Sequence, residues 1–310
     1  MNVSWINTLL LLLSFILALT LPFHLFLFAY AVLGPLHYLS EIAWLHDKNY
    51  FTDKSFKRIS TSLIWLMGIF AFFGAIIFSG TPWLALLLVF SLTALLTSPY
   101  SIKNTVFIFS YVAIAAYLFY TYSFLGLLFA ILLPTLVHVY IFTFFFMLQG
   151  ALIKKSFHQS INAFSFLSLP LLFFIITPLF FIDPTSGIQE NYLQSFSYLH
   201  ETLFSLVAIP YSVDALFNSA LGIAFMQFIA FAYTYHYLNW FSKTSVIGWT
   251  VSARKYKYII LLGWIFSLYV YFIDYRAGIS LLAFLSFIHV ILEFPLNHMS
   301  YRTIWSRLKK

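Results

Sequence analysis

The sequence predicts an all-α fold, a polytopic transmembrane helix bundle of roughly eight to ten membrane segments. Of its 310 residues, 62% are hydrophobic and only 8% are charged, whereas charged residues make up about 25% of an ordinary soluble domain. The apolar runs are long enough to cross a bilayer many times. No polar stretch is long enough to build a second core, so we expect residues 1–310 to form a single integral membrane domain.

Apolar segments of about 16 to 26 residues follow one another along the whole chain. The predicted segments are 5–21, 24–45, 59–79, 82–97, 104–121, 126–150, 161–182, 215–240, 258–274 and 278–298. Only Pro22 and Phe23 separate the first two, which must form a tight hairpin or one broken helix. The stretch 183–214 is too polar to cross a membrane, and we expect a long loop there.

The basic residues test this segmentation independently. With a cytoplasmic N-terminus, every lysine and arginine except Arg276 falls on the inner side, in the stretches 46–58, 98–103, 151–160, 241–257 and the C-terminal tail. The loop 183–214 carries only acidic charges, as an outer loop should. This asymmetry is what the positive-inside rule predicts, so both termini are expected to be cytoplasmic.

Composition excludes several classes of function. The chain has no cysteine, which removes disulfides, thiolate metal sites and cysteine nucleophiles. Its formal net charge of +7 is explained by topology and by contact with anionic lipid. No stretch resembles a nucleic-acid-binding module, so we expect membrane lipid and no nucleic acid as a partner.

Histidines inside the apolar segments are the first functional candidates. His37, His138, His236 and His289 lie on the second, sixth, eighth and tenth segments, which all run from outside to inside. Neutral imidazole is a common ligand of zinc, copper and iron. The other histidines lie at segment ends or in loops, where a solvated or interfacial side chain is expected: His24, His46, His158, His200 and His298.

Two glutamates accompany these histidines at helical spacing. Glu41 follows His37 by one turn, and Glu293 follows His289 by one turn, so each pair shares one helix face. A carboxylate in hydrocarbon must be protonated or compensated by a donor or a cation. The surrounding segments contain no lysine or arginine, so a metal cation is the predicted compensating charge.

Two arrangements of the metal centre fit these residues. Four imidazoles could hold one Fe(II), with Glu41 and Glu293 accepting hydrogen bonds from the second nitrogens of the histidines. Alternatively, the glutamates could bind directly in a two-metal centre. We prefer the first, while zinc and haem remain alternatives. Gln149 and Asn239 are weaker candidates for the outer shell.

The histidine motifs resemble those of the Brp/Blh-type bacterial β-carotene 15,15′-dioxygenases. Gly34-Pro35-Leu36-His37 with the trailing Glu41 resembles a Gly-Leu-Pro-His motif with a following acid. The second, third and closing motifs are matched by Leu136-Val137-His138, Tyr235-His236 and His289-Val290-Ile291-Leu292-Glu293-Phe294-Pro295-Leu296-Asn297-His298. The resemblance implies a multi-pass enzyme of the bacterial inner membrane that uses histidine-bound iron and O₂ to cleave a carotenoid to retinal.

The chain departs from the family pattern at two positions. Trp240 stands where the third motif has a second histidine, and Pro35 lies one residue earlier than the family's proline. Either His289 supplies the missing ligand, or the chain acts on another substrate. In both cases a metal among apolar helices would be reached by O₂ and by a long apolar lipid entering from the bilayer.

Two other classes of function compete with an oxygenase. An ion- or proton-coupled transporter also buries histidine and glutamate, and Pro134, Pro170, Pro178 and Pro295 could mark its broken helices. No inverted repeat supports that class, and the polar residues are few for an aqueous path. A non-catalytic membrane scaffold would bind no metal.

Overall fold

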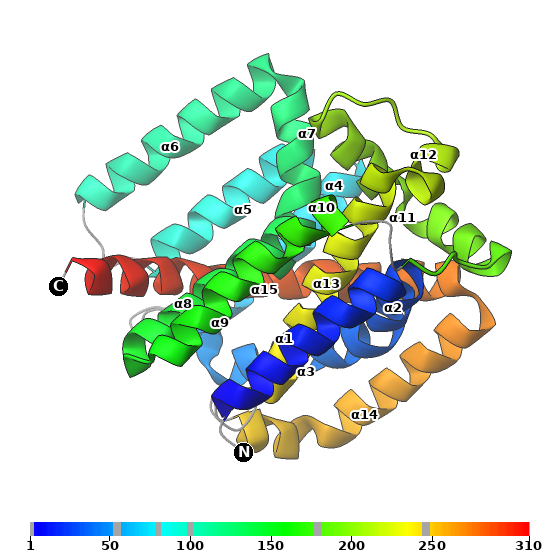
Figure 1. The fold of residues 1–310 in the computed structure, drawn as a ribbon. Coiled ribbons are helices and arrows are strands. Elements are labelled where there is room, and N and C mark those ends of the chain that lie inside the picture. The colour runs from blue at the N-terminus through cyan, green and yellow to red at the C-terminus, as the bar shows by residue number, and fades with distance from the viewer. Residues whose placement is uncertain are drawn as a thin grey trace. The chain divides into compact units, whose positions relative to one another are not determined.

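A computed structural model describes residues 3–51, 57–77, 82–97, 102–176, 181–243 and 249–309, and the described residues form helices and no strand (Figure 1). Five helices are long and apolar enough to cross a membrane: Pro22–Asp47, Ser123–Lys154, Phe157–Ile176, Lys255–Ile273 and Tyr275–Leu308. Shorter apolar helices cover Ser4–Thr20, Ser62–Gly74, Pro82–Thr97 and Thr105–Thr121. The predicted all-α, multi-pass membrane fold is confirmed.

The described chain divides into two compact units. Unit 1 comprises Met1–Leu39 and Val139–Leu282, and unit 2 comprises Ser40–His138 and Ala283–Lys310. The division falls inside three helices, α3 (Gly34–Asp47), η4 (Leu133–Phe142) and α15 (Tyr275–Leu308). Pro178 lies outside the described residues. The single membrane domain stays a prediction.

Unit 1 is built around α13. Its other helices are α1 (Val3–Thr20), α2 (Pro22–Phe28), η1 (Ala29–Leu33), α8 (Thr143–Lys154), α9 (Phe157–Ser168), η5 (Leu169–Leu172), α10 (Phe173–Ile176), α11 (Ser186–Leu206), α12 (Val213–Asn218) and α14 (Trp249–Ile273), with α13 covering Ala220–Ser242. α13 carries no charged residue and is buried along most of its length, in contact with α1, α2, η1, α10 and α12. Interhelical polar bonds fix it, including Gln227 Nε2 to the Leu19 carbonyl at 2.8 Å.

The stretch 183–214 contains a helix, so the prediction of a loop there was wrong. α11 runs from Ser186 to Leu206 and buries Tyr192, Leu199 and Leu203, which recur at helical spacing. The stretch is polar on average but amphipathic. The helix packs on α2 and α13. It was not predicted because the polar residues lower the average hydropathy of the stretch.

Unit 2 contains η2 (Asn49–Phe51), α4 (Lys57–Ile77), α5 (Pro82–Thr97), α6 (Ile102–Thr121) and α7 (Ser123–Leu132). α5 packs against α4, α6 and α7. The unit 2 part of α15 approaches α4 closely, because a side chain at Gly68 would overlap Ile288. Phe294 of the same helix packs edge to face on Phe90 of α5, with ring centroids 5.0 Å apart.

Two helices widen into π-helical turns near the predicted ligands. η1 ends four residues before His37, and the Gly34 N–H bonds to the Ala29 carbonyl, five residues back. η4 contains His138 itself. A proline lies next to each widened turn: Pro35 follows η1, and Pro134 is near the start of η4. In a regular α-helix, a proline ring would clash with the carbonyl of the preceding turn, and a widened turn relieves that clash. Each widened turn rotates the residues after it relative to a continuous α-helix.

Candidate metal centre

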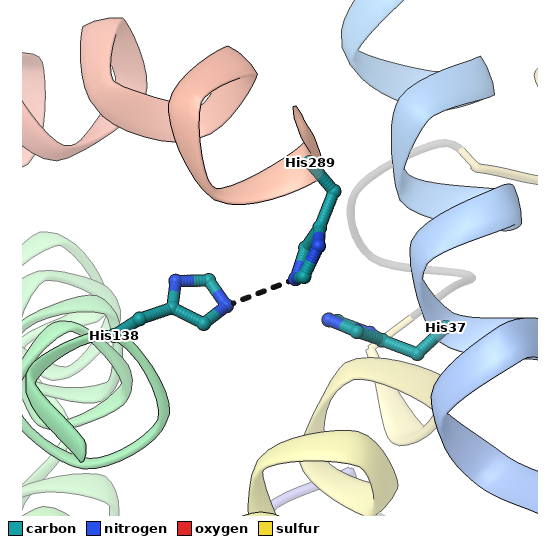
Figure 2. A group of neighbouring side chains, drawn as sticks. All are labelled: His37, His138 and His289. Atoms are coloured by element: carbon teal, nitrogen blue, oxygen red, sulfur yellow. Dashed lines mark hydrogen bonds between the residues drawn. The ribbon is translucent and has the colours of Figure 1, made fainter. Parts of the chain in front are cut away.

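Two buried imidazoles meet in unit 2. His138 lies in η4 and is 1% exposed, and His289 lies in α15 and is 5% exposed. Their Nε2 atoms are 3.2 Å apart, and the rings cross at 80°. Figure 2 shows the two rings turned toward each other, with a dashed line joining these nitrogens. The facing atoms are therefore ring nitrogens that can bind a metal.

The second nitrogen of each ring is held by an acceptor. His138 Nδ1 lies 2.9 Å from Glu293 Oε2, and His289 Nδ1 lies 3.3 Å from the Leu285 carbonyl oxygen. The Leu285 carbonyl can only accept a hydrogen bond, and so can Glu293 when it is ionised, in which case Nδ1 carries the proton in both rings. A neutral imidazole has one N–H, and both Nε2 atoms then present lone pairs to each other. They repel unless a cation or a proton lies between them.

Two carboxyl groups of unit 2, those of Glu41 and Glu293, are buried near these imidazoles. Glu41 is 1% exposed and Glu293 is 2% exposed. Glu41 interacts electrostatically with His138 and with Glu293. Burying two neighbouring carboxylates without a counter-charge is costly, since like charges repel and hydrocarbon does not solvate them. A divalent cation would balance both charges.

A second pair of imidazoles lies in unit 1. His236 Nε2 is 3.0 Å from His37 Nε2. His37 is 0% exposed and His236 is 6% exposed. The hydroxyl of Thr143, on α8, lies 2.6 Å from His236 Nδ1 and fixes the orientation of that ring. A hydroxyl can donate or accept, so this contact does not assign the proton on His236.

Both Nε2 separations match those of neighbouring ligands on one ion. Metal–nitrogen bonds of about 2.1 Å place two ligand atoms about 3.0 Å apart at a right angle and about 3.4 Å apart at the tetrahedral angle. The observed values are 3.0 and 3.2 Å. Held Nδ1 atoms and converging Nε2 atoms are the usual pattern of metal-binding histidines.

The structure places the predicted residues as follows. His37, His138 and His289 are buried histidines that could hold a metal ion. Glu293 contacts His138 on η4, so its possible partners were not limited to residues of its own helix. Thr143 was missed by the sequence analysis. The same segment also contains Thr135 and Gln149, so the sequence alone did not single out Thr143.

Two histidines expected to be solvated or interfacial are buried instead. His298 is 9% exposed, and its Nε2 lies 2.9 Å from the Phe90 carbonyl oxygen in unit 2. His200 is fully buried in α11. That expectation was wrong because α11 was not recognised as a helix and because α15 continues past residue 298.

A search for related proteins finds no matching protein-family model, curated protein or solved structure. Fold and geometry thus define the class, an all-α multi-pass membrane protein with buried histidines able to bind a metal. The resemblance to Brp/Blh-type dioxygenases stays a prediction.

Proposed function

We propose that the protein is a membrane-embedded non-haem iron oxygenase that acts on a long apolar lipid. The observation that carries the proposal is the pair of facing Nε2 atoms of His138 and His289, with both Nδ1 atoms directed at acceptors. A bound cation removes the repulsion between these lone pairs. It also balances the charges of Glu41 and Glu293.

Iron is the metal that best fits the donor set. The chain has no thiolate to offer, and its buried donors here are imidazoles and carboxylates. Two histidines and one carboxylate are the ligands of many Fe(II) oxygenases, and they leave positions open for O₂. Zinc, haem and a two-metal centre remain alternatives. That His37 and His236 bind the same ion stays a prediction.

The residues of the centre have separate roles in this proposal. The iron, when bound, supplies the activation of O₂. Glu293 holds the His138 ring in one orientation and raises the basicity of its Nε2. The Leu285 carbonyl does the same for His289. Glu41 contributes charge, as a ligand or from just outside the ligand set. Burial of these groups excludes bulk water from the reaction.

The proposed substrate class follows from the setting. Among the described residues, the centre lies on helices that could cross a membrane, so an apolar lipid reaches it from the bilayer. The motif resemblance makes a carotenoid, cleaved by O₂ to a retinal-like aldehyde, the first candidate. The corresponding location is the inner membrane of a bacterium, with both termini cytoplasmic.

Metal analysis of the purified protein tests the centre. We expect iron in the wild-type protein and its loss in His138→Ala and in His289→Ala. His46→Ala, which changes an exposed histidine of unit 2, is the matched control and should keep the metal. Metal retained in both buried variants would reject the ligand pair. The variants His37→Ala and His236→Ala then show whether unit 1 supplies ligands to that ion.

Expression in a host that makes β-carotene tests the substrate. Loss of the orange colour with formation of retinal would support carotene cleavage, and the His289→Ala variant should leave the colour unchanged. Persistent colour with the wild-type protein, expressed and loaded with iron, would reject β-carotene as the substrate. The metal centre is judged separately, by its metal content.

A further inference from the structure

A second group of polar side chains lies in unit 1, formed by Tyr192, His200 and the half-buried Tyr211. Tyr192 and His200 are fully buried on α11, and their ring centroids are 5.5 Å apart. Tyr211 follows α11, packs on Phe204 with ring centroids 5.8 Å apart, and interacts electrostatically with Tyr192. Three polar side chains from residues 192–211 therefore gather at one place.

Their polar atoms lack partners within the described chain. No described residue forms a hydrogen bond with His200 Nδ1 or Nε2, or with the hydroxyls of Tyr192 and Tyr211. Each buried, unsatisfied polar atom costs about 1–3 kcal/mol. A histidine with only a packing role would donate its N–H to a neighbouring carbonyl, as the contact of His298 with the Phe90 carbonyl illustrates. The group is therefore suited to a polar ligand.

The chemistry of that ligand follows from the charge of the group. Burial lowers the pKa of His200 to about 3, so its imidazole is neutral at pH 7 and offers one donor and one acceptor. The two phenols offer further donors and acceptors. An anion would need a lysine or arginine, and the stretch 183–214 contains neither. A neutral hydroxyl or carbonyl oxygen matches the group.

A row of aromatic rings leads from this group toward His37 within unit 1. The row runs from Tyr192 to Phe26, Tyr233, Tyr237 and His37, with centroid separations of 5.9, 5.1, 6.1 and 5.0 Å. Aromatic side chains line the binding sites of many long apolar ligands. The polar group thus lies at one end of a row of buried aromatic rings whose other end is His37, a candidate metal ligand.

We propose that Tyr192, His200 and Tyr211 bind a hydroxyl or carbonyl group at the end of a long apolar lipid, whose chain lies along this row of rings. The inference rests on the proposed function in taking that lipid as the substrate. It narrows the substrate class to polyenes that carry an oxygen function at one end. A pure hydrocarbon would leave the polar atoms unsatisfied.

A matched pair of lipids tests the proposal. β-Carotene and zeaxanthin share one carbon skeleton, and zeaxanthin carries a hydroxyl at each end. We expect metal-free protein in detergent to bind zeaxanthin about tenfold more tightly, since one hydrogen bond contributes roughly 0.5–1.5 kcal/mol and two or more form. Quenching of tryptophan fluorescence measures both affinities. Equal affinities in the wild-type protein would overturn the proposal.

Substitutions test whether these side chains cause the preference for zeaxanthin. Tyr192→Phe and His200→Phe should each lose the preference for zeaxanthin over β-carotene. Tyr140→Phe, which removes a hydroxyl bonded to the Leu167 carbonyl elsewhere in unit 1, should keep it. A preference that survives in both variants would show that buried water alone fills the group. If His200→Phe does not fold, Tyr192→Phe, which deletes one oxygen, decides alone. Because this binding test uses metal-free protein, equal affinities for the two lipids would leave the iron proposal intact. Absence of iron from the purified protein would likewise leave the lipid-binding result unaffected.

Discussion

Whether His138 and His289 can bind a metal together depends on where the protons of their rings lie. A proton between the two Nε2 atoms would make them a packing pair. A packing pair of neutral imidazoles would share one N–H between the two Nε2 atoms. In unit 2, the Leu285 carbonyl and, when it is ionised, the Glu293 carboxylate hold the protons on the Nδ1 atoms instead. The shared N–H survives only if Glu293 is protonated and donates to His138. The charge of Glu293 is therefore the quantity to change.

Replacing Glu293 with glutamine should weaken metal binding about 10- to 100-fold, the usual effect of losing a group that orients a ligand. Glutamine keeps the shape of the side chain, but it carries no charge to balance the cation and holds His138 less strongly. Metal titration by calorimetry measures the change. Glu201→Gln removes the same charge from an exposed position and serves as the control. Unchanged affinity in Glu293→Gln would show that His138 needs no charged partner.

The buried imidazole of His200 should make the protein less stable in acid. Its pKa falls from 6.5 to about 3 on folding because burial disfavours the charged form. Above pH 6.5 neither state is protonated at this position. Below pH 6.5 the unfolded state gains a proton that the folded state does not, so the free energy of unfolding falls by about 1.4 kcal/mol per pH unit down to about pH 3.

Thermal unfolding in detergent at pH 7 and pH 5 measures this contribution. The wild-type protein should lose more stability between these values than His200→Phe, which has no titrating group at the position. Tyr192→Phe retains the imidazole and should lose as much as the wild-type protein. Equal losses in the wild-type protein and His200→Phe would mean that His200 is solvated, as the sequence had suggested.

At the scale of the element, the apolar helices follow from the sequence, and the irregular turns do not. Length and hydropathy are enough to predict segments such as 82–97, which matches α5. The π-helical turns η1 and η4 depend on how a proline ring and its neighbours are accommodated, which composition does not specify. The rotation of His37 and His138 therefore could not be predicted, although their burial could.

Gly222 shows how closely two helices can meet. A Cβ atom at this position of α13 would overlap the carbonyl oxygens of Ala215 and Leu216 in α12, which are backbone atoms and cannot turn aside. We expect Gly222→Ala to destabilise unit 1 by more than about 2 kcal/mol, as overpacking usually does. Thermal unfolding measures the loss.

Gly187→Ala is the matched control for this prediction. It lies in α11 with no atom within 4 Å of its Cβ position, so alanine should be neutral or slightly stabilising there because it lowers the entropy of the unfolded chain. An equal effect of the two substitutions would contradict the close packing of α12 against α13.

For the whole molecule, the sequence predicted the membrane class and the burial of the four histidines, but not which of these histidines pair. His138 and His289 lie far apart in the chain, and no periodicity relates them, yet they meet in unit 2. Likewise, Thr143 became informative only once its hydroxyl was placed beside His236. Apolar composition determines that such groups are buried. Tertiary packing determines which of them meet.

The asymmetric distribution of basic residues predicts the orientation in the membrane, which site-specific labelling can test. The chain has no cysteine, so a single introduced thiol is the only reactive one. Glu190→Cys lies on an exposed position of α11, and Lys309→Cys lies in the exposed C-terminal tail. With both termini cytoplasmic, a membrane-impermeant maleimide should label Glu190→Cys in intact cells and Lys309→Cys only after permeabilisation. The cysteine-free parent should remain unlabelled under both conditions. The reverse pattern would invert the topology, and labelling of both variants in intact cells would require a different number of crossings between α11 and the C-terminus.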